Sequence, residues 1–167
     1  MRTTALLAAT LATFGFSQLA GADATANLAV SASVANGCTI TAANTLGFGA
    51  YNTVSGAAVN SSAAIQVACT TGTETTITLG EGAHADALSS GDAPLRQMID
   101  GDGNLLAYTL FSDAQRSVVW GNTVGTGLGY VALTSAGADQ TVFGRITANQ
   151  DVPAGMYTDS VLATIAF

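Results

Sequence analysis

Basic charge is scarce in this chain of 167 residues, and lysine is absent altogether. The four basic residues are all arginines, against eleven acidic residues, and the formal net charge is −7. The lack of lysine excludes Schiff-base chemistry at a lysine and lysine–asparagine crosslinks between subunits. Because nucleic acid is bound mainly through positive charge, it is a poor partner for this surface.

Cysteine is also rare, since Cys38 and Cys69 are the only two in the chain. A metal or redox site would need further ligands or a C-x-x-C spacing, and neither accompanies this pair. An even pair in an exported chain is expected to form a structural disulfide. Closing a loop of about 32 residues in this way stabilises a fold by roughly 3–4 kcal/mol.

Long apolar runs are missing beyond the first residues of the chain. There, Arg2 precedes a short apolar run over residues 5–16, and Ala20-Gly21-Ala22 has the small-x-small form of a cleavage site. This pattern predicts a cleaved export signal over residues 1–22, too short to anchor the chain in a membrane. Cleavage after Ala22 would leave 167 − 22 = 145 residues, the size of one domain, with a formal net charge of 3 − 11 = −8.

What the chain does contain is glycine, alanine, threonine and serine in short segments of alternating polarity. Turn signals separate these segments at Asn36-Gly37, at Glu81–Gly91 and at Asp151–Gly155, and no convincing helix follows the signal. The pattern predicts an all-β, immunoglobulin-like sandwich in one domain. Its predicted strands are residues 38–41, 46–51, 64–69, 73–79, 105–111, 118–120, 130–134, 140–147 and 156–167.

The segment Asn27–Val34 is a further predicted strand, at the start of the mature chain. Four apolar residues fall on one of its faces: Leu28, Val30, Ala32 and Val34. Such a strand can lay its apolar row into a groove and offer its backbone to neighbouring strands. We expect it to complete the fold of another copy of the chain, so that the product is a fibre.

Catalytic and metal sites find little support in the sequence. His84, with Asp86 nearby, could serve a serine hydrolase, but no G-x-S-x-G elbow occurs. Asp100–Asn104 has the alternating oxygens of a calcium loop, yet Leu105 and Phe111 replace its glycine and its terminal glutamate. We therefore predict a solvated turn at Asp100–Asn104, no enzyme and no cofactor, while a weak calcium site there stays open.

Aromatic side chains offer a second binding hypothesis, because aromatic faces suit sugar rings. Trp120, Tyr108 and Tyr157 could line such a surface. Most aromatic residues on strands fill the core instead, and this is the interpretation that we favour for all three.

Several segments, in order along the chain, resemble one known family. They are the opening strand leading into Ala35–Thr39 (A-N-G-C-T), Leu46–Tyr51 (L-G-F-G-A-Y), Ile65–Thr70 (I-Q-V-A-C-T), Leu106–Arg116 (L-A-Y-T-L-F-S-D-A-Q-R) and Gly155–Phe167 (G-M-Y-T-D-S-V-L-A-T-I-A-F). They are similar to the spore coat protein U domain, which is also the major subunit of archaic, Csu-type chaperone–usher pili. The resemblance covers nearly the whole mature chain.

This resemblance implies an incomplete immunoglobulin-like sandwich that lacks its final strand. A periplasmic chaperone would hold the subunit and pass it to an outer-membrane usher, and copies would polymerise by donor-strand exchange into an extracellular pilus for adhesion and biofilm formation. Residues 23–36 would be the donor strand and residues 37–167 the pilin domain. Cys38 and Cys69 match the disulfide positions of the family. The groove-filling row would be Leu28, Val30, Ala32 and Val34, and the edge of the acceptor groove, where the chaperone docks, would be Val161, Ala163, Ile165 and Phe167.

Other functions stay open at this point. The alternatives are a self-complete secreted sandwich that binds carbohydrate or a surface, and a spore-coat or other surface-layer protein.

Overall fold

The computed structural model describes residues 21, 23–42 and 44–167, which fall into two units, residues 1–33 and residues 34–167. Most of the predicted export signal, residues 1–20 and 22, lies outside the described residues. The described part of the first unit has neither helix nor strand, and its side chains are exposed, Leu28 by 88% and Val30 by 86%. Within the part of the chain that the structure describes, no helix is long and apolar enough to cross a membrane.

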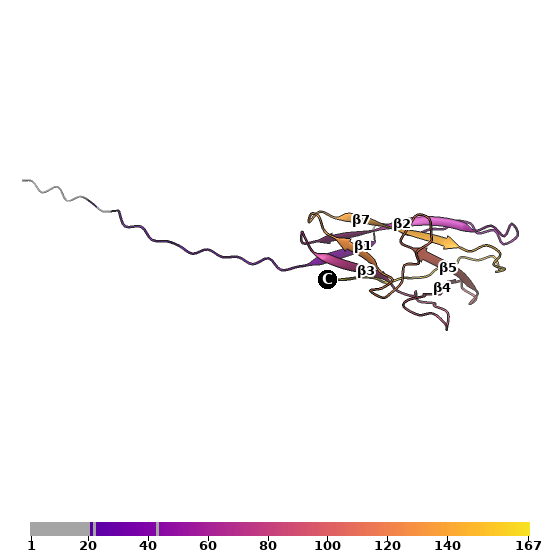
Figure 1. The fold of residues 1–167 in the computed structure, drawn as a ribbon. Helices are drawn as coiled ribbons and strands as arrows, with labels where there is room; N and C mark the ends of the chain where they lie inside the picture. Colours follow the sequence, from indigo (N-terminus) through magenta and orange to yellow (C-terminus); the bar gives the residue numbers. More distant parts are fainter. Residues whose placement is uncertain (1–20, 22, 43) are drawn as a thin grey trace, which may run out of the picture. The chain divides into compact units, whose positions relative to one another are not determined.

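The second unit is built from antiparallel strands in two sheets (Figure 1). One sheet has five strands in the order β1-β2-β7-β5-β4, and the other has three in the order β6-β3-β8. The strands are β1 (Cys38–Ala42), β2 (Val59–Cys69), β3 (Glu74–Leu79), β4 (Arg96–Ile99), β5 (Leu105–Phe111), β6 (Leu128–Val131), β7 (Ala138–Ile146) and β8 (Ala163–Ala166).

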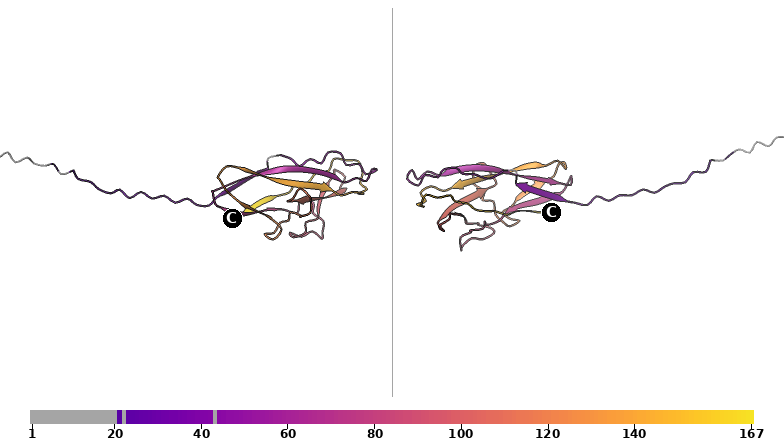
Figure 2. Two further views of the ribbon diagram at one scale, coloured as in Figure 1. Left: turned by 45° about the horizontal axis from the view of Figure 1, so that its top comes forward. Right: turned by 180° about the vertical axis from the view of Figure 1, so that it is seen from behind.

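The hydrophobic core lies between the two sheets, because each strand turns alternate side chains inward. Val67 on β2, Ile77 on β3 and Ile146 on β7 are buried there, and Trp120 joins them from the segment after β5. Each such side chain contributes roughly 1.5–3 kcal/mol through burial. Figure 2 shows the layers from two further sides, with the C-terminus at the end of the domain where β1 begins.

Residues 118–121 join the two sheets along one side of the sandwich, which we call the closed seam. Val119 forms a bridge with Phe111 of β5, and the Gly121 carbonyl accepts a hydrogen bond of 3.0 Å from the Leu79 amide of β3. The segment therefore pairs with both sheets. The predicted hairpin after β5 is present, but only as this bridge and its flanking hydrogen bonds.

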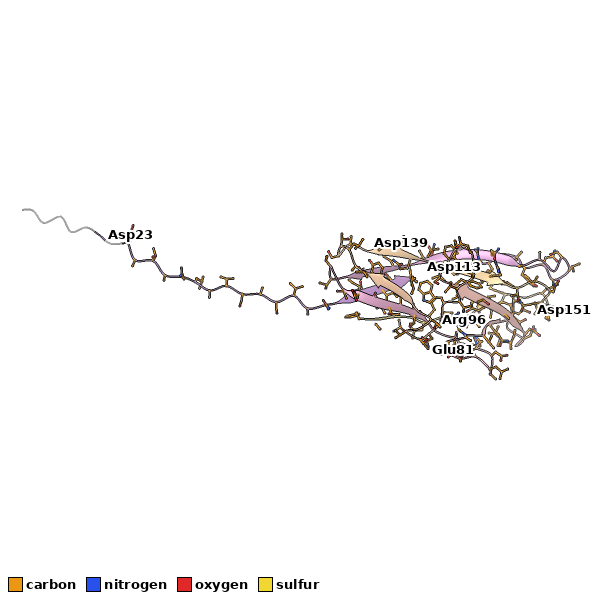
Figure 3. The ribbon with its side chains drawn as sticks, viewed as in Figure 1. Asp23, Glu81, Arg96, Asp113, Asp139 and Asp151 are labelled. Atoms are coloured by element: carbon orange, nitrogen blue, oxygen red, sulfur yellow. A yellow bond between two sulfur atoms is a disulfide. The ribbon has the colours of Figure 1, made fainter. Side chains whose placement is uncertain are left out.

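Buried polar side chains reinforce the closed seam. The Arg96 guanidinium donates to the carbonyls of Gly80, Leu79 and Trp120 at 2.7 to 2.8 Å, and the Trp120 indole donates to the Ile77 carbonyl at 2.8 Å. Arg96 lies within the body of the domain, whereas Asp139 and Asp151 lie toward its ends (Figure 3). Burial lowers the pKa of Arg96 to about 10, so the side chain is still a cation at neutral pH.

Three strand predictions are wrong in whole or in part, and one of them, residues 130–134, overlaps β6 only at Tyr130 and Val131. The segment Leu46–Tyr51 is not a strand, because Gly49 has a φ of 72° and the Gly47 carbonyl is taken by the Ser61 hydroxyl at 2.6 Å. The last predicted strand is reduced to β8 and one bridge between Thr158 and Ile99. The sequence interpretation also missed β4.

The predicted turn at Asn36-Gly37 is wrong as well. Neither residue has a positive φ, and the backbone there continues the extended course of β1. The Gly37 carbonyl accepts from the Thr70 amide at 2.9 Å, and the Ala35 carbonyl accepts from the Thr70 hydroxyl at 3.2 Å. These two hydrogen bonds hold residues 35–37 in an extended conformation.

Candidate functional site: an open groove between the sheets

A large apolar groove opens between the two sheets on the side of β1 and β8. Its volume is about 1180 Å³. One wall consists of the second half of β1 and residues 44–53, and the other consists of residues 152–163. The floor is made of core side chains that are each exposed by 9% or less, namely Ile65, Leu79, Met98, Leu106, Leu110, Val142 and Ile146.

The groove is flanked by two unpaired strand edges. β1 is the last strand of the five-stranded sheet and β8 is the last strand of the three-stranded sheet. Among the described residues, no strand pairs with the outer side of either one. A free edge beside an apolar groove presents hydrogen-bonding groups and core side chains together, and these are the features that a further strand would cover. We call this side of the sandwich the open seam.

The wall formed by residues 44–53 is held in place although it is not a strand. Leu46 and Phe48 lie over Gly144 of β7, where a Cβ would come within 2.9 Å of Leu46 and 2.8 Å of Phe48. The Tyr51 hydroxyl donates to the Thr147 carbonyl at 3.1 Å and accepts from the Gln150 amide at 2.8 Å. Glycine at position 144 and these hydrogen bonds fix the position of the wall.

The opposite wall is fixed by a buried carboxylate, that of Asp159. Its oxygens accept hydrogen bonds from the Tyr108 hydroxyl at 2.6 Å and the Ala83 amide at 2.9 Å, and one of them lies 3.3 Å from His84 Nδ1. A Cβ at Gly82 would collide with this carboxylate. Burial first, and the bond to Asp159 second, raise the pKa of Tyr108. The carboxylate thereby ties residues 152–162 to β5 and to the loop after β3.

His84 is therefore placed beside Asp159 and not beside Asp86, whose carboxylate accepts from the Leu88 amide at 2.9 Å. This pair supports a wall of the groove. In the neighbouring hairpin, the Asp100 carboxylate accepts from the Asp102 amide at 3.0 Å and from the Asn104 amide at 2.8 Å. The hydrogen bonds from Asn104 lower the pKa of Asp100. The described residues contain no group of three or more His, Cys, Asp or Glu that could hold a metal ion.

The aromatic residues weighed as a sugar surface are part of the core, as predicted. Trp120 is completely buried, Tyr108 is buried, and Tyr157 is half-buried and packs against the core cluster. Phe48 meets Tyr108 edge to face, with the ring centroids 6.0 Å apart. These side chains shape the groove and its surroundings.

The cysteine prediction is confirmed, since Cys38 and Cys69 form a disulfide. The bond joins the first residue of β1 to its directly paired residue at the end of β2. It therefore fixes the strand that borders the groove to the rest of its sheet.

The four residues predicted for the acceptor edge do not lie in equivalent places. Val161 and Ala163 line the groove. Ile165 is half-buried against the core, while Phe167 is 61% exposed. The sequence interpretation missed the wall at residues 44–53 and the anchoring Asp159, although the apolar alternation of L-G-F-G-A-Y was a usable signal for the first.

Comparison with known proteins places this architecture in a family. The model of the Spore Coat Protein U domain matches residues 24–164. The chain belongs to the Spore Coat Protein U domain family. One relative that aligns with most of the chain is Protein U of Myxococcus xanthus. It is 38% identical over 161 residues, which cover 91% of this chain and 89% of that protein.

The fold of this Spore Coat Protein U domain is shared with a solved pilus protein. The structure is the CsuC–CsuE chaperone–tip adhesion subunit pre-assembly complex from the archaic chaperone–usher Csu pili of Acinetobacter baumannii. The similarity has a TM-score of 0.52 at 22% identity, over 80% of this chain and 40% of that chain. The chain thus spans about two fifths of the length of the solved one. The predicted family and the all-β, immunoglobulin-like sandwich are confirmed.

Proposed function

We propose that this protein is a structural subunit of an extracellular fibre, a pilus of the archaic chaperone–usher kind, in which residues 23–36 of one copy fill the groove of the next. We call residues 23–36 the N-terminal arm. The observation that carries the proposal is the groove of the open seam, an apolar cavity of about 1180 Å³ that lies beside the free edges of β1 and β8. One added strand would cover all three.

The N-terminal arm suits this groove in pattern. Leu28, Val30, Ala32 and Val34 share one face of an extended strand, and residues 24–36 carry no charge. Leu28, Val30 and Val34 are between 84% and 88% exposed, so burying them in a groove would lower the free energy. Together with a ladder of backbone hydrogen bonds, burial of this row would supply on the order of 10 kcal/mol before ordering costs.

The same groove implies partners during assembly. Free strand edges beside an apolar groove favour aggregation unless something covers them. A periplasmic chaperone would cover the open seam, an outer-membrane usher would pass the subunit outward, and the finished pilus on the cell surface would serve adhesion and biofilm formation. The solved complex that shares the fold contains a chaperone, which supports the first of these partners. This role requires neither a catalytic residue nor a cofactor.

A surface coat is the second candidate. The family is described by its spore coat member, and the relative named Protein U spans almost the whole of this chain. A coat could be assembled by the same strand donation, so the two candidates differ in the final structure and share the joint between copies. Electron microscopy of purified material separates thin filaments from sheets or amorphous layers.

The experiment that tests strand donation compares two neighbouring substitutions, Val30→Asp and Ser31→Asp. Val30 belongs to the apolar row, so a carboxylate there would enter the groove, where an unpaired charge costs several kcal/mol. Ser31 lies on the other face and should tolerate the change. We expect filaments and a heat-resistant ladder of multimers from Ser31→Asp but not from Val30→Asp. If Val30→Asp polymerises like the parent chain, the proposed function is wrong.

A further inference from the structure

We propose that Thr70 decides which groove the N-terminal arm fills: by holding residues 35–37 extended, it directs the arm into another copy of the chain and away from its own. The inference rests on the proposed function and adds to it a residue that sets the direction of donation. It starts from the contrast between the Asn36-Gly37 sequence and the backbone observed there.

Asn-Gly is a strong hairpin signal, because a type I′ turn needs positive φ at both of its central residues. A hairpin at Asn36-Gly37 would return residues 27–34 along the outer side of β1. That side borders the groove, so the returned arm would lie in the groove of its own domain. A chain closed in this way has no arm to donate and no groove to offer.

Thr70 opposes the hairpin through two of its own groups. Its hydroxyl donates to the Ala35 carbonyl at 3.2 Å and lies 3.5 Å from the Gly37 carbonyl, and its amide donates to the Gly37 carbonyl at 2.9 Å. These bonds continue the pairing of β1 with β2 beyond the disulfide at Cys38 and Cys69. Reversal of the chain at Asn36-Gly37 would break the contact with Ala35.

Thr70 is itself held in position by the turn between β2 and β3. Its carbonyl accepts from the Thr73 amide at 3.0 Å. Gly72, inside that turn, has a φ of 84° and donates its amide to the Ala132 carbonyl at 2.8 Å. The hydroxyl therefore acts from a fixed point and does not move with residues 35–37.

The test removes the hydroxyl alone, by Thr70→Val, with Thr70→Ser as the matched control that keeps it. Each chain is refolded from denaturant at micromolar concentration, and monomer is separated from polymer by size. A monomer that has filled its own groove is recognised by its failure to bind a fluorescent peptide of residues 24–35. We expect Thr70→Val to raise the ratio of self-filled monomer to polymer about fivefold, the effect of losing one hydrogen bond of ordinary strength. Thr70→Ser should match the parent.

A second variant acts from the other side of the contact. Valine at position 37 strongly disfavours the positive φ that the hairpin needs, so Gly37→Val should lower the self-filled fraction in the parent and cancel the rise in Thr70→Val. Equal self-filled fractions in Thr70→Val and Thr70→Ser would overturn the inference, and so would a Gly37→Val substitution that does not cancel the rise. In either case, polymerisation of the parent would still support the proposed function. If the Val30→Asp chain, whose groove is free, does not bind the peptide, the proposed function fails and the inference fails with it.

Discussion

The two seams between the sheets of this sandwich differ in how they are closed. At the closed seam, residues 118–121 pair with both sheets, and Arg96 and Trp120 bond to buried carbonyls across the gap. At the open seam, β1 and β8 face a groove of about 1180 Å³ with no strand between them among the described residues. The sandwich therefore lacks a strand on one side only, while its other side is held by strand pairing and buried hydrogen bonds.

The two seams also differ in the hydrogen-bonding groups and apolar side chains that they present to another molecule. At the closed seam, Arg96 Nε and Nη2 and the Trp120 indole are bonded to carbonyls, whereas the buried Arg96 Nη1 has no hydrogen-bond partner among the described residues. The open seam offers backbone groups along β8 and apolar side chains on the groove floor, which are the groups that a strand can use. Its walls are nevertheless fixed, by Asp159 on one side and by Tyr51 on the other.

The largest expected effect follows from breaking the closed seam. Arg96→Met removes a buried cation from three carbonyl partners and leaves those carbonyls unsatisfied. We expect a loss of roughly 3–5 kcal/mol in the free energy of unfolding. The measurement is urea unfolding in the Val30→Asp background, followed by the fluorescence of Trp120, with the half-exposed Arg145→Met as control. A loss no larger than that of the control would mean that the polar contacts do not hold the seam.

The disulfide at the open seam comes next. Replacing both Cys38 and Cys69 by Ser should lower the free energy of unfolding by roughly 3–4 kcal/mol on the loop-entropy estimate. The same urea experiment measures it, and added reductant should destabilise the parent but not the double variant. Free thiols found by alkylation of the native protein would show that the bond is not formed.

Ile165 of β8 and Phe167, which follows β8, are expected to contribute differently to stability. Ile165→Asp puts a charge against the core and should cost roughly 3 kcal/mol of stability. Phe167→Asp changes an exposed side chain and should alter stability by less than about 0.5 kcal/mol. Urea unfolding compares them. If both substitutions lower the free energy of unfolding equally, Ile165 and Phe167 do not differ in burial as the structure indicates.

The last effect concerns the wall of the groove and depends on pH. Tyr108→Phe removes a hydrogen bond to Asp159 and should cost about 2 kcal/mol at pH 7. Because the pKa of Tyr108 is raised in the folded chain, only the unfolded chain ionises this tyrosine just above its ordinary pKa of about 10. The stability due to Tyr108 is therefore complete below about pH 10 and declines above it. Urea titrations at pH 8 and pH 11 should show the gap between parent and variant narrowing; a constant gap would contradict this explanation.

Much of the fold could be predicted from the sequence because the longer strands alternate clearly. β5 and β7 were predicted within two residues of their observed ends. β4 was missed because Arg96, a charged residue, takes an inward position there and breaks the apolar pattern. Local signals also failed where tertiary contacts outweigh them, as at Asn36-Gly37, which Thr70 holds extended.

The groove could not be predicted from residue patterns alone, because it arises where no strand is present. The resemblance to a family suggested it, and the row Val161, Ala163, Ile165 and Phe167 was then read as one continuous edge. Val161 and Ala163 line the groove, whereas Ile165 packs against the core and Phe167 is exposed after the end of β8, so the row departs from one continuous edge. The two-residue alternation of apolar side chains alone does not predict such a departure.

The central claim is that the N-terminal arm completes the open seam, and hydrogen–deuterium exchange on assembled material tests it most directly. The amides of residues 27–34 and of β8 are measured by mass spectrometry in the assembled parent and in the Val30→Asp chain. We expect both segments to exchange at least about a hundredfold more slowly in the assembled parent, because each gains strand partners. If residues 27–34 exchange in the assembled parent as fast as in the free peptide, the arm does not fill the groove and the account is wrong.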